Sequence, residues 1–109
     1  MILERRYTLP LSIATSGSQE VIAAPGAGKR IAIDHINLIV TTAVNVTFYS
    51  GSTALSGTYP FDTKQAMVLE NTTTDPEGVI ACNDNEAFNI TLGSAVQVSG
   101  FIRYRILNG

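Results

Sequence analysis

The fold class is decided by the stretch Val96-Gln97-Val98-Ser99-Gly100-Phe101-Ile102-Arg103-Tyr104-Arg105-Ile106-Leu107, near the end of the chain. Successive side chains of a β-strand point to opposite faces, so its alternate residues form two sets. One set is apolar or small: Val96, Val98, Gly100, Ile102, Tyr104 and Ile106. The other is mixed: Gln97, Ser99, Phe101, Arg103, Arg105 and Leu107. This period of two predicts a long strand rather than a helix, and we expect part of the mixed face to be covered too.

Shorter segments of the chain repeat the same alternation. Turn residues separate them, and Pro10 places the first at a sheet edge because proline cannot donate a ladder hydrogen bond. The segment 53–59 is ambiguous between strand and loop, and 60–64 is expected to be a loop. The remaining strands are expected over 7–14, 19–24, 29–42, 44–49, 66–70, 79–82 and 88–92.

The run 29–42 contains a break in its pattern. Ile31 and Ile33 share one parity, whereas Ile36, Leu38 and Val40 share the other. Such a change of phase needs one extra residue. We therefore expect a β-bulge, or a strand crossing between sheets, near Asp34 and His35.

This pattern predicts an all-β fold with one domain. Short antiparallel strands, about seven to nine of them with regularly spaced turns, are typical of a jelly-roll-like β-sandwich or a small barrel. The chain has 109 residues, enough for one domain that folds without disulfide or metal staples. We expect a flexible N-terminal arm over residues 1–6 and a single β-sandwich domain over residues 7–109.

The composition limits the classes of partner. Charged residues make up 15% of the chain, below the usual share of about 25%, and the formal net charge is −2. We infer that other subunits cover some of the surface, and we expect no binding to nucleic acid or membranes. The alternative is that Thr, Ser and Asn solvate the surface instead. With no leader pattern before Glu4, synthesis in a cytoplasm is expected.

No convincing set of catalytic or cofactor-binding residues emerges. His35 is the one histidine, and on a regular strand the adjacent Asp34 would point to the opposite face, which disfavours a Ser-His-Asp arrangement. Cys82, the one cysteine, is expected to be a buried small hydrophobe. One histidine and one cysteine do not supply a zinc site. The sequence therefore predicts a non-enzymatic protein without a metal or cofactor.

Other motifs are better explained by structure than by chemistry. The segment 24–30 resembles a phosphate loop but lacks its first glycine and its Ser or Thr, so a turn is expected. Asp75, Glu77 and the segment 83–86 offer oxygen ligands for calcium without the spacing of an EF-hand, which favours polar turns. Three segments match the N-glycosylation pattern and are interpreted as solvent-facing: those that begin at Asn45, Asn71 and Asn89.

Three segments carry a resemblance to a known class of protein. The longest runs from Val21 through Gly28-Lys29-Arg30-Ile31 to the sequence Val46-Thr47-Phe48-Tyr49-Ser50-Gly51-Ser52-Thr53-Ala54-Leu55-Ser56-Gly57, and the other two cover 86–90 and 95–100. They resemble small β-sandwich structural proteins of tailed bacteriophages, above all head decoration (cement) proteins. The resemblance implies a jelly-roll-like homo-oligomer, with a trimer favoured over a dimer. It also implies attachment to the major capsid protein on the virion surface.

The leading hypothesis is therefore a virion protein that binds between capsid subunits and stabilises the head. We expect capsid contact through Glu4, Arg5, Arg6 and Tyr7, and self-association through Phe101 and Leu107. The alternative is a receptor- or carbohydrate-binding module of a tail fibre or a surface adhesin. A small hydrolase is a third hypothesis, which the lone His35 disfavours.

Overall fold

The computed structural model describes residues 6–71 and 78–108, and these residues form strands, turns and loops without a helix. Ten strands follow one another along the chain: β1 (Arg6–Ile13), β2 (Gly17–Ile22), β3 (Lys29–Val40), β4 (Val44–Ser50), β5 (Thr53–Ala54), β6 (Tyr59–Phe61), β7 (Ala66–Glu70), β8 (Ile80–Ala81), β9 (Phe88–Leu92) and β10 (Val98–Asn108). The all-β prediction is confirmed. The number of strands exceeds seven to nine by one, because the three-residue β6 lies largely in a segment expected to be a loop.

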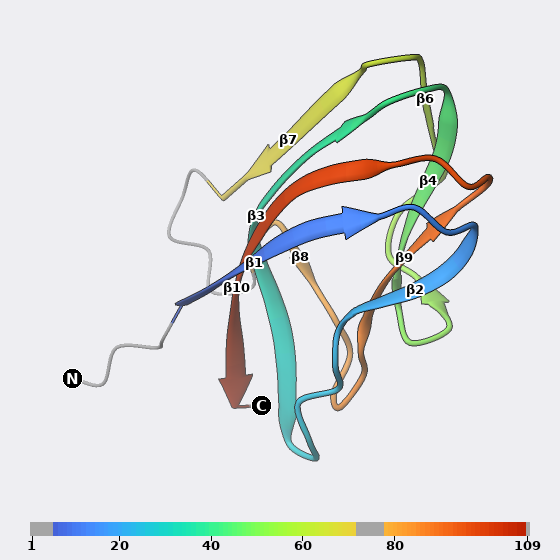
Figure 1. The fold of residues 1–109 in the computed structure, drawn as a ribbon. Coiled ribbons are helices and arrows are strands. Elements are labelled where there is room, and N and C mark those ends of the chain that lie inside the picture. The colour runs from blue at the N-terminus through green and yellow to red at the C-terminus, as the bar shows by residue number, and fades with distance from the viewer. Residues whose placement is uncertain (1–5, 72–77, 109) are drawn as a thin grey trace.

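The strands form two antiparallel sheets that pack as a sandwich (Figure 1). Sheet one has the order β1-β10-β3-β7, with β8 paired to β3. Sheet two has the order β2-β9-β4, with β5 and β6 both paired to β4. The first strand pairs with the last, and the next strand inward, β2, pairs with β9 in the opposite sheet. This nested pairing is the jelly-roll arrangement, so the sandwich is confirmed over the small barrel.

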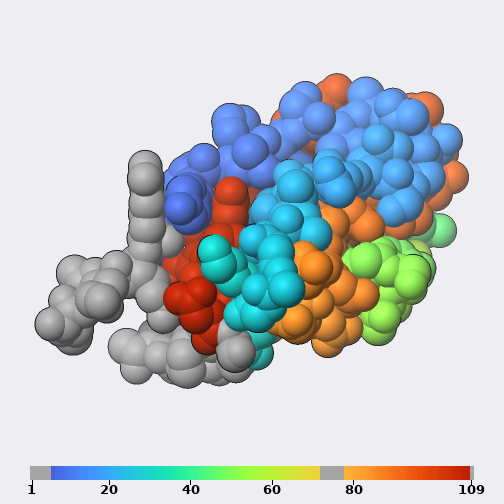
Figure 2. All heavy atoms as spheres, turned by 90° about the horizontal axis from the view of Figure 1, so that it is seen from below, coloured from blue at the N-terminus to red at the C-terminus, as the bar shows by residue number. Residues whose placement is uncertain are grey.

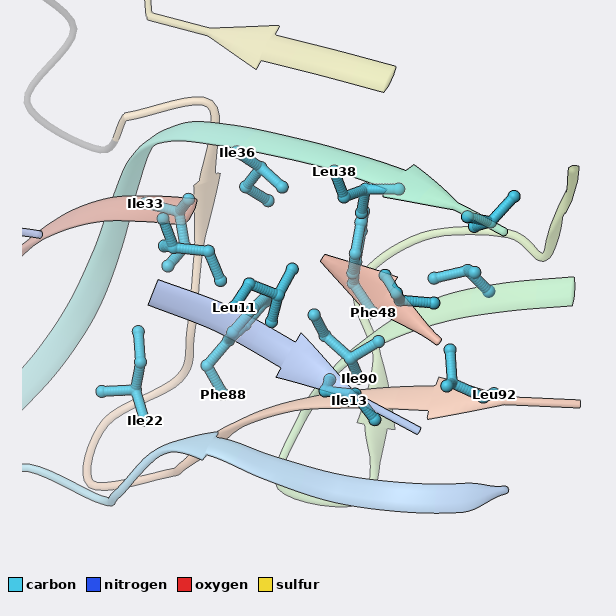
Figure 3. Close-up of a cluster of buried hydrophobic side chains, with 14 of the residues drawn as sticks. Leu11, Ile13, Ile22, Ile33, Ile36, Leu38, Phe48, Phe88, Ile90 and Leu92 are labelled. Atoms are coloured by element: carbon cyan, nitrogen blue, oxygen red, sulfur yellow. The ribbon is translucent and has the colours of Figure 1, made fainter. Parts of the chain in front are cut away.

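The core lies between the sheets and follows the predicted alternation. Ile36, Leu38 and Ile102 of sheet one are fully buried against Phe48 and Ile90 of sheet two (Figure 3). Burying an aliphatic or aromatic side chain of this size stabilises a fold by about 1.5–3 kcal/mol. The alternate residues of the same strands remain on the outside, and their polar or apolar character decides what the surface can contact.

The expected bulge is present in β3. Arg103 of β10 pairs with His35, and the next residue, Tyr104, pairs with Ile33, so Asp34 is the extra residue. The phase change between Ile33 and Ile36 therefore reflects a bulge, not a crossing between sheets. At the start of β3, the backbone oxygen of Lys29 accepts a hydrogen bond from the Asn85 amide, which lies in the segment that leads into β9.

The structure also bears on three expectations about single strands. Pro10 lies in β1, which is an edge strand of sheet one as predicted. The last strand begins at Val98, two residues later than expected. The segment 60–64 is not entirely loop, because Pro60 and Phe61 belong to β6 and pair with β4.

Candidate functional site

A buried ionic cluster forms around the bulge. The Asp34 carboxylate is 5% exposed and accepts hydrogen bonds from Arg105, at 2.7 Å from Nε and 2.9 Å from Nη2. Asn71 Nδ2 donates to it at 3.3 Å, and Arg6 Nε lies 3.7 Å away. One carboxylate thus ties together β1, β3, β10 and the residue after β7.

Opposing effects set the pKa of Asp34. Burial raises the pKa, but the hydrogen bonds from Arg105 and Asn71 and the charges of Arg105 and Arg6 together lower it by more. The net result is a pKa below the ordinary value of an aspartate, so the group is ionised at neutral pH. A carboxylate held in this way is suited to structural cross-linking rather than to proton transfer.

The bulge also corrects the expectation that Asp34 and His35 point to opposite faces. Both residues line one small polar hollow, together with Arg6, Glu70 and Arg103. In a bulge the two residues opposite a single partner lose the strict alternation of the strand, which brings them to the same side. His35 packs on Phe101 with ring centroids 5.0 Å apart and planes 10° apart, so the imidazole is engaged by stacking rather than by a nucleophile.

The expected capsid-contact residues lie at the start of β1, as far as the structure describes them. Glu4 and Arg5 lie outside the described residues. Arg6 begins β1 instead of belonging to the expected arm, and its side chain is 63% exposed. Tyr7 is also exposed, and its ring stacks on Tyr104 at 5.2 Å. An exposed Arg-Tyr pair therefore marks this end of the edge strand.

The two residues expected to mediate self-association have different environments. Phe101 is partly exposed and lies on the side of β10 that faces away from sheet two. Leu107 is only 6% exposed, which removes it from any surface that a second copy could contact. The mixed face of the last strand is thus covered at its C-terminal end, as expected, and open around Phe101.

Register aligns the outward residues of sheet one into rows that cross four strands. We call these residues the outer face. They fall into three rows in the order β1, β10, β3, β7: Thr8-Arg103-His35-Glu70, Pro10-Phe101-Asn37-Val68 and Ser12-Ser99-Ile39-Ala66. Ile39 and Val68, two of the three large hydrophobic residues that are most exposed, both lie here at 46% and 56% exposure. The face is therefore apolar in its middle and charged along one row.

A second polar cluster joins β4 to the segment before β9. Ser50 is fully buried, its Oγ donates to Glu86 Oε1 at 2.8 Å, and it accepts from the Asn83 amide at 2.9 Å. Cys82, 3% exposed as predicted, lies beside it, and burial raises the pKa of its thiol to about 11. A thiol of this kind is inert, so the cluster fixes a loop and offers no nucleophile.

The segment 24–30 is a turn, as expected. The Gly26 amide donates to Asn85 Oδ1 at 2.9 Å and the Gly28 amide to Asp84 Oδ2 at 3.4 Å. Figure 2 shows this end of the molecule, where the segment after β2 lies beside the orange segment that leads into β9. The Asp84 and Asn85 side chains thus accept hydrogen bonds from backbone amides, whereas the Asn83 side chain donates to Glu86 Oε1.

Within residues 6–71 and 78–108, no three His, Cys, Asp or Glu side chains gather as metal ligands would. Asp75 and Glu77 lie outside the described residues. Of the three glycosylation-pattern residues, Asn45 is exposed, whereas Asn71 and Asn89 donate hydrogen bonds to Asp34 and to the Gly51 oxygen. The described residues also contain no helix long and apolar enough to cross a membrane.

Comparison with known proteins gives a likeness of fold. No protein-family model matches the chain, and no curated protein matches it. A solved structure of Bacillus endospore appendages, a family of disulfide-linked pili, matches 97% of this chain and 87% of its own, at 15% identity and a TM-score of 0.56. A designed double-stranded β-helix (13% identity, TM-score 0.35) covers 93% of this chain and 99% of its own. A chain of the T13 IBDV viral particle (15% identity, TM-score 0.43) covers 93% and 30% respectively.

Sequence reasoning missed the Asp34–Arg105 pair. A signal was present, because Asp34 interrupts the most apolar run of the chain at the point where the phase changes. An acidic residue in such a run is rarely buried without a cation. The partner, 71 residues away, becomes apparent only once β10 is placed beside β3.

Proposed function

We propose that the chain is a non-enzymatic structural protein of a tailed-phage virion, which binds the outer capsid surface and stabilises the head. The observation that carries this proposal is the exposed pair Arg6 and Tyr7 at the start of an edge strand. Arginine and tyrosine are enriched at protein interfaces, because each combines a large contact area with a polar end. Edge strands also present unpaired backbone groups to a partner.

The fold is compatible with this role. Jelly rolls are common in capsid proteins, and the endospore appendage structure, which matches 97% of this chain, belongs to a protein that assembles into pili. A disulfide-linked assembly of that kind is not supported here, because Cys82 is 3% exposed and is the one cysteine in the sequence. Repeated non-covalent contacts on a symmetric lattice would instead gain strength through multivalency.

Co-sedimentation with capsids tests the proposal. Purified tailed-phage capsids that lack this protein are mixed with the wild-type chain, which should pellet with them to a saturating ratio. Tyr7→Ala should reduce apparent affinity by about tenfold or more, as expected if this exposed ring anchors the contact, and Arg5→Glu, in the expected contact segment, should also weaken it. Failure of the wild type to pellet at any ratio would overturn the proposed function.

Two controls make the result specific. Lys64→Glu changes the charge as Arg5→Glu does, but it lies just before β7, and it should leave capsid binding unchanged. Arg6→Glu is avoided, because Arg6 lies 3.7 Å from Asp34 and its reversal would also disturb the buried cluster. Binding that survives both Arg5→Glu and Tyr7→Ala would remove the start of β1 from the contact.

A further inference from the structure

The outer face combines an apolar centre with two charged residues, Arg103 and Glu70. Arg103 and Glu70 lie in one row, separated by His35 on the strand between them. Two strand spacings put them about 10 Å apart. In the part of the chain that the structure describes, neither side chain forms an ion pair. Opposite charges on either side of one strand, beside the partly exposed Phe101 and the exposed Ile39 and Val68, form a self-complementary pattern.

We propose that the outer face binds a second copy of this chain, with a two-fold axis that runs along β3. A rotation of 180° about this axis sets each row of one copy opposite the same row of the second copy. It also sets β10 of each copy opposite β7 of the other. Arg103 of one copy then faces Glu70 of the other, and the same contact is repeated on the other side of the axis. Phe101 faces Val68 in the same way, and Ile39 faces its own counterpart at the axis.

Charge complementarity selects this axis over the two simple alternatives. An axis between β10 and β3 would place Arg103 against His35 and Glu70 against Thr8, which leaves the carboxylate without a cation. An axis across the strands at Asn37 would place Arg103 against a serine and Glu70 against an alanine. Burying either charge unpaired is costly, whereas the axis along β3 pairs both.

About this axis only β10, β3 and β7 lie opposite strands of the second copy, because β1 has no counterpart beyond β7. The contact therefore covers about 15 Å across three strands and about 15 Å along them. This area is smaller than that of a standard interface of roughly 800 Å² per partner, so we expect a reversible dimer with a Kd of the order of tens of micromolar.

Sedimentation equilibrium of the chain alone tests the dimer, independently of any capsid partner. From about 10 μM to about 1 mM, the mass should rise toward that of two chains. Glu70→Arg and Arg103→Glu should each weaken self-association by about tenfold or more, because each places like charges opposite one another. The double variant Glu70→Arg/Arg103→Glu restores the pairing with reversed sign, and should return within about threefold of the wild-type Kd.

Cysteine cross-linking tests the axis. Ile39→Cys should form a dimer disulfide under mild oxidation, because this residue faces itself across the axis. Ser12→Cys, also exposed but on β1, should not, and buried Cys82 does not compete. A monomer at all concentrations, or a double variant no better than the single variants, would overturn the proposal. So would charge reversals that weaken capsid binding while leaving self-association intact, since the face would then belong to the capsid.

Discussion

Replacing Asp34 by asparagine should be the most damaging isosteric change in this protein. The carboxylate accepts two hydrogen bonds from Arg105, whose side chain is only 11% exposed. An amide at this position would turn a donor toward the guanidinium and leave its charge buried without a counter-ion. Removing one partner of such a pair costs about 3–5 kcal/mol.

The loss is large relative to the stability of a domain of this size. At roughly 0.05–0.15 kcal/mol per residue, the whole chain is stabilised by about 5–16 kcal/mol. The pair with Arg6 adds little to the cost of the substitution, because that side chain is 63% exposed and its contact is 3.7 Å long. A loss of 3–5 kcal/mol should lower Tm by about 12–20 °C.

Urea unfolding followed by circular dichroism measures this loss without the screening that guanidinium would introduce. Glu20→Gln is the matched control, because it makes the same carboxyl-to-amide change at an exposed position of β2, away from the Asp34 cluster and the outer face, and it should cost less than about 0.5 kcal/mol. Replacing Asp34 and Arg105 together by leucine and methionine should cost less than the sum of the two single changes. A loss below about 1 kcal/mol for Asp34→Asn would refute the reasoning.

The same pair predicts how stability changes with pH. The pKa of Asp34 is lower in the folded chain than in the unfolded one, so the unfolded state binds the proton more readily. The contribution of the pair is complete above the unfolded pKa of about 3.9, and it is lost as the pH falls through the lower folded value. The difference in unfolding free energy between wild type and Asp34→Asn should therefore be constant from pH 7 to about pH 5 and shrink below about pH 4.

Three further substitutions or modifications probe the fold. Cys82 in the native protein should react with a thiol reagent at pH 8 roughly 100-fold more slowly than in urea, since burial raises its pKa to about 11; equal rates would contradict this burial. Gly100→Ala should cost about 2 kcal/mol or more, because a Cβ would clash with the Asn37 carbonyl oxygen at a φ of +156°. Gly57→Ala, in open space, is its control and should leave the urea midpoint unchanged. Phe48→Ala should cost about 3–5 kcal/mol in the same assay, because the ring is fully buried.

The alternation of apolar and polar residues allowed the strands and the core to be predicted, because within each strand the apolar set indicates which face is buried. Val98 and Ile102 on β10, and Leu38 and Val40 on β3, are buried as their parity requires. The short strands were harder: β6 was expected to be a loop and β5 was ambiguous, because the pairing of two or three residues depends on neighbours already in place. Leu107 shows the other limit, because its parity placed it on the mixed face, part of which was expected to be covered, but did not reveal that the covered part is this end.

The outer face could not be predicted, because a row gathers residues from four strands whose order follows from the nested topology. Arg103, His35 and Glu70 are distant in sequence and become neighbours only through the registers of β10 and β7 on β3. Parity gave each residue its side of the sheet but not its neighbours across the strands.

The bulge at Asp34 links the core, which the sequence predicts, to the buried Asp34–Arg105 pair, which it does not. On a regular strand, Asp34 would point to the face opposite His35, away from the side on which Arg6 and Arg105 lie. One extra residue moves the carboxylate to their side, and the buried cluster forms there. The same residue keeps Ile31 and Ile33 in the core on one side of the bulge and Ile36 and Leu38 on the other. The change of phase in the apolar pattern is thus the one sequence feature that specifies both the core and the ion pair, and deleting Asp34 should disrupt both together.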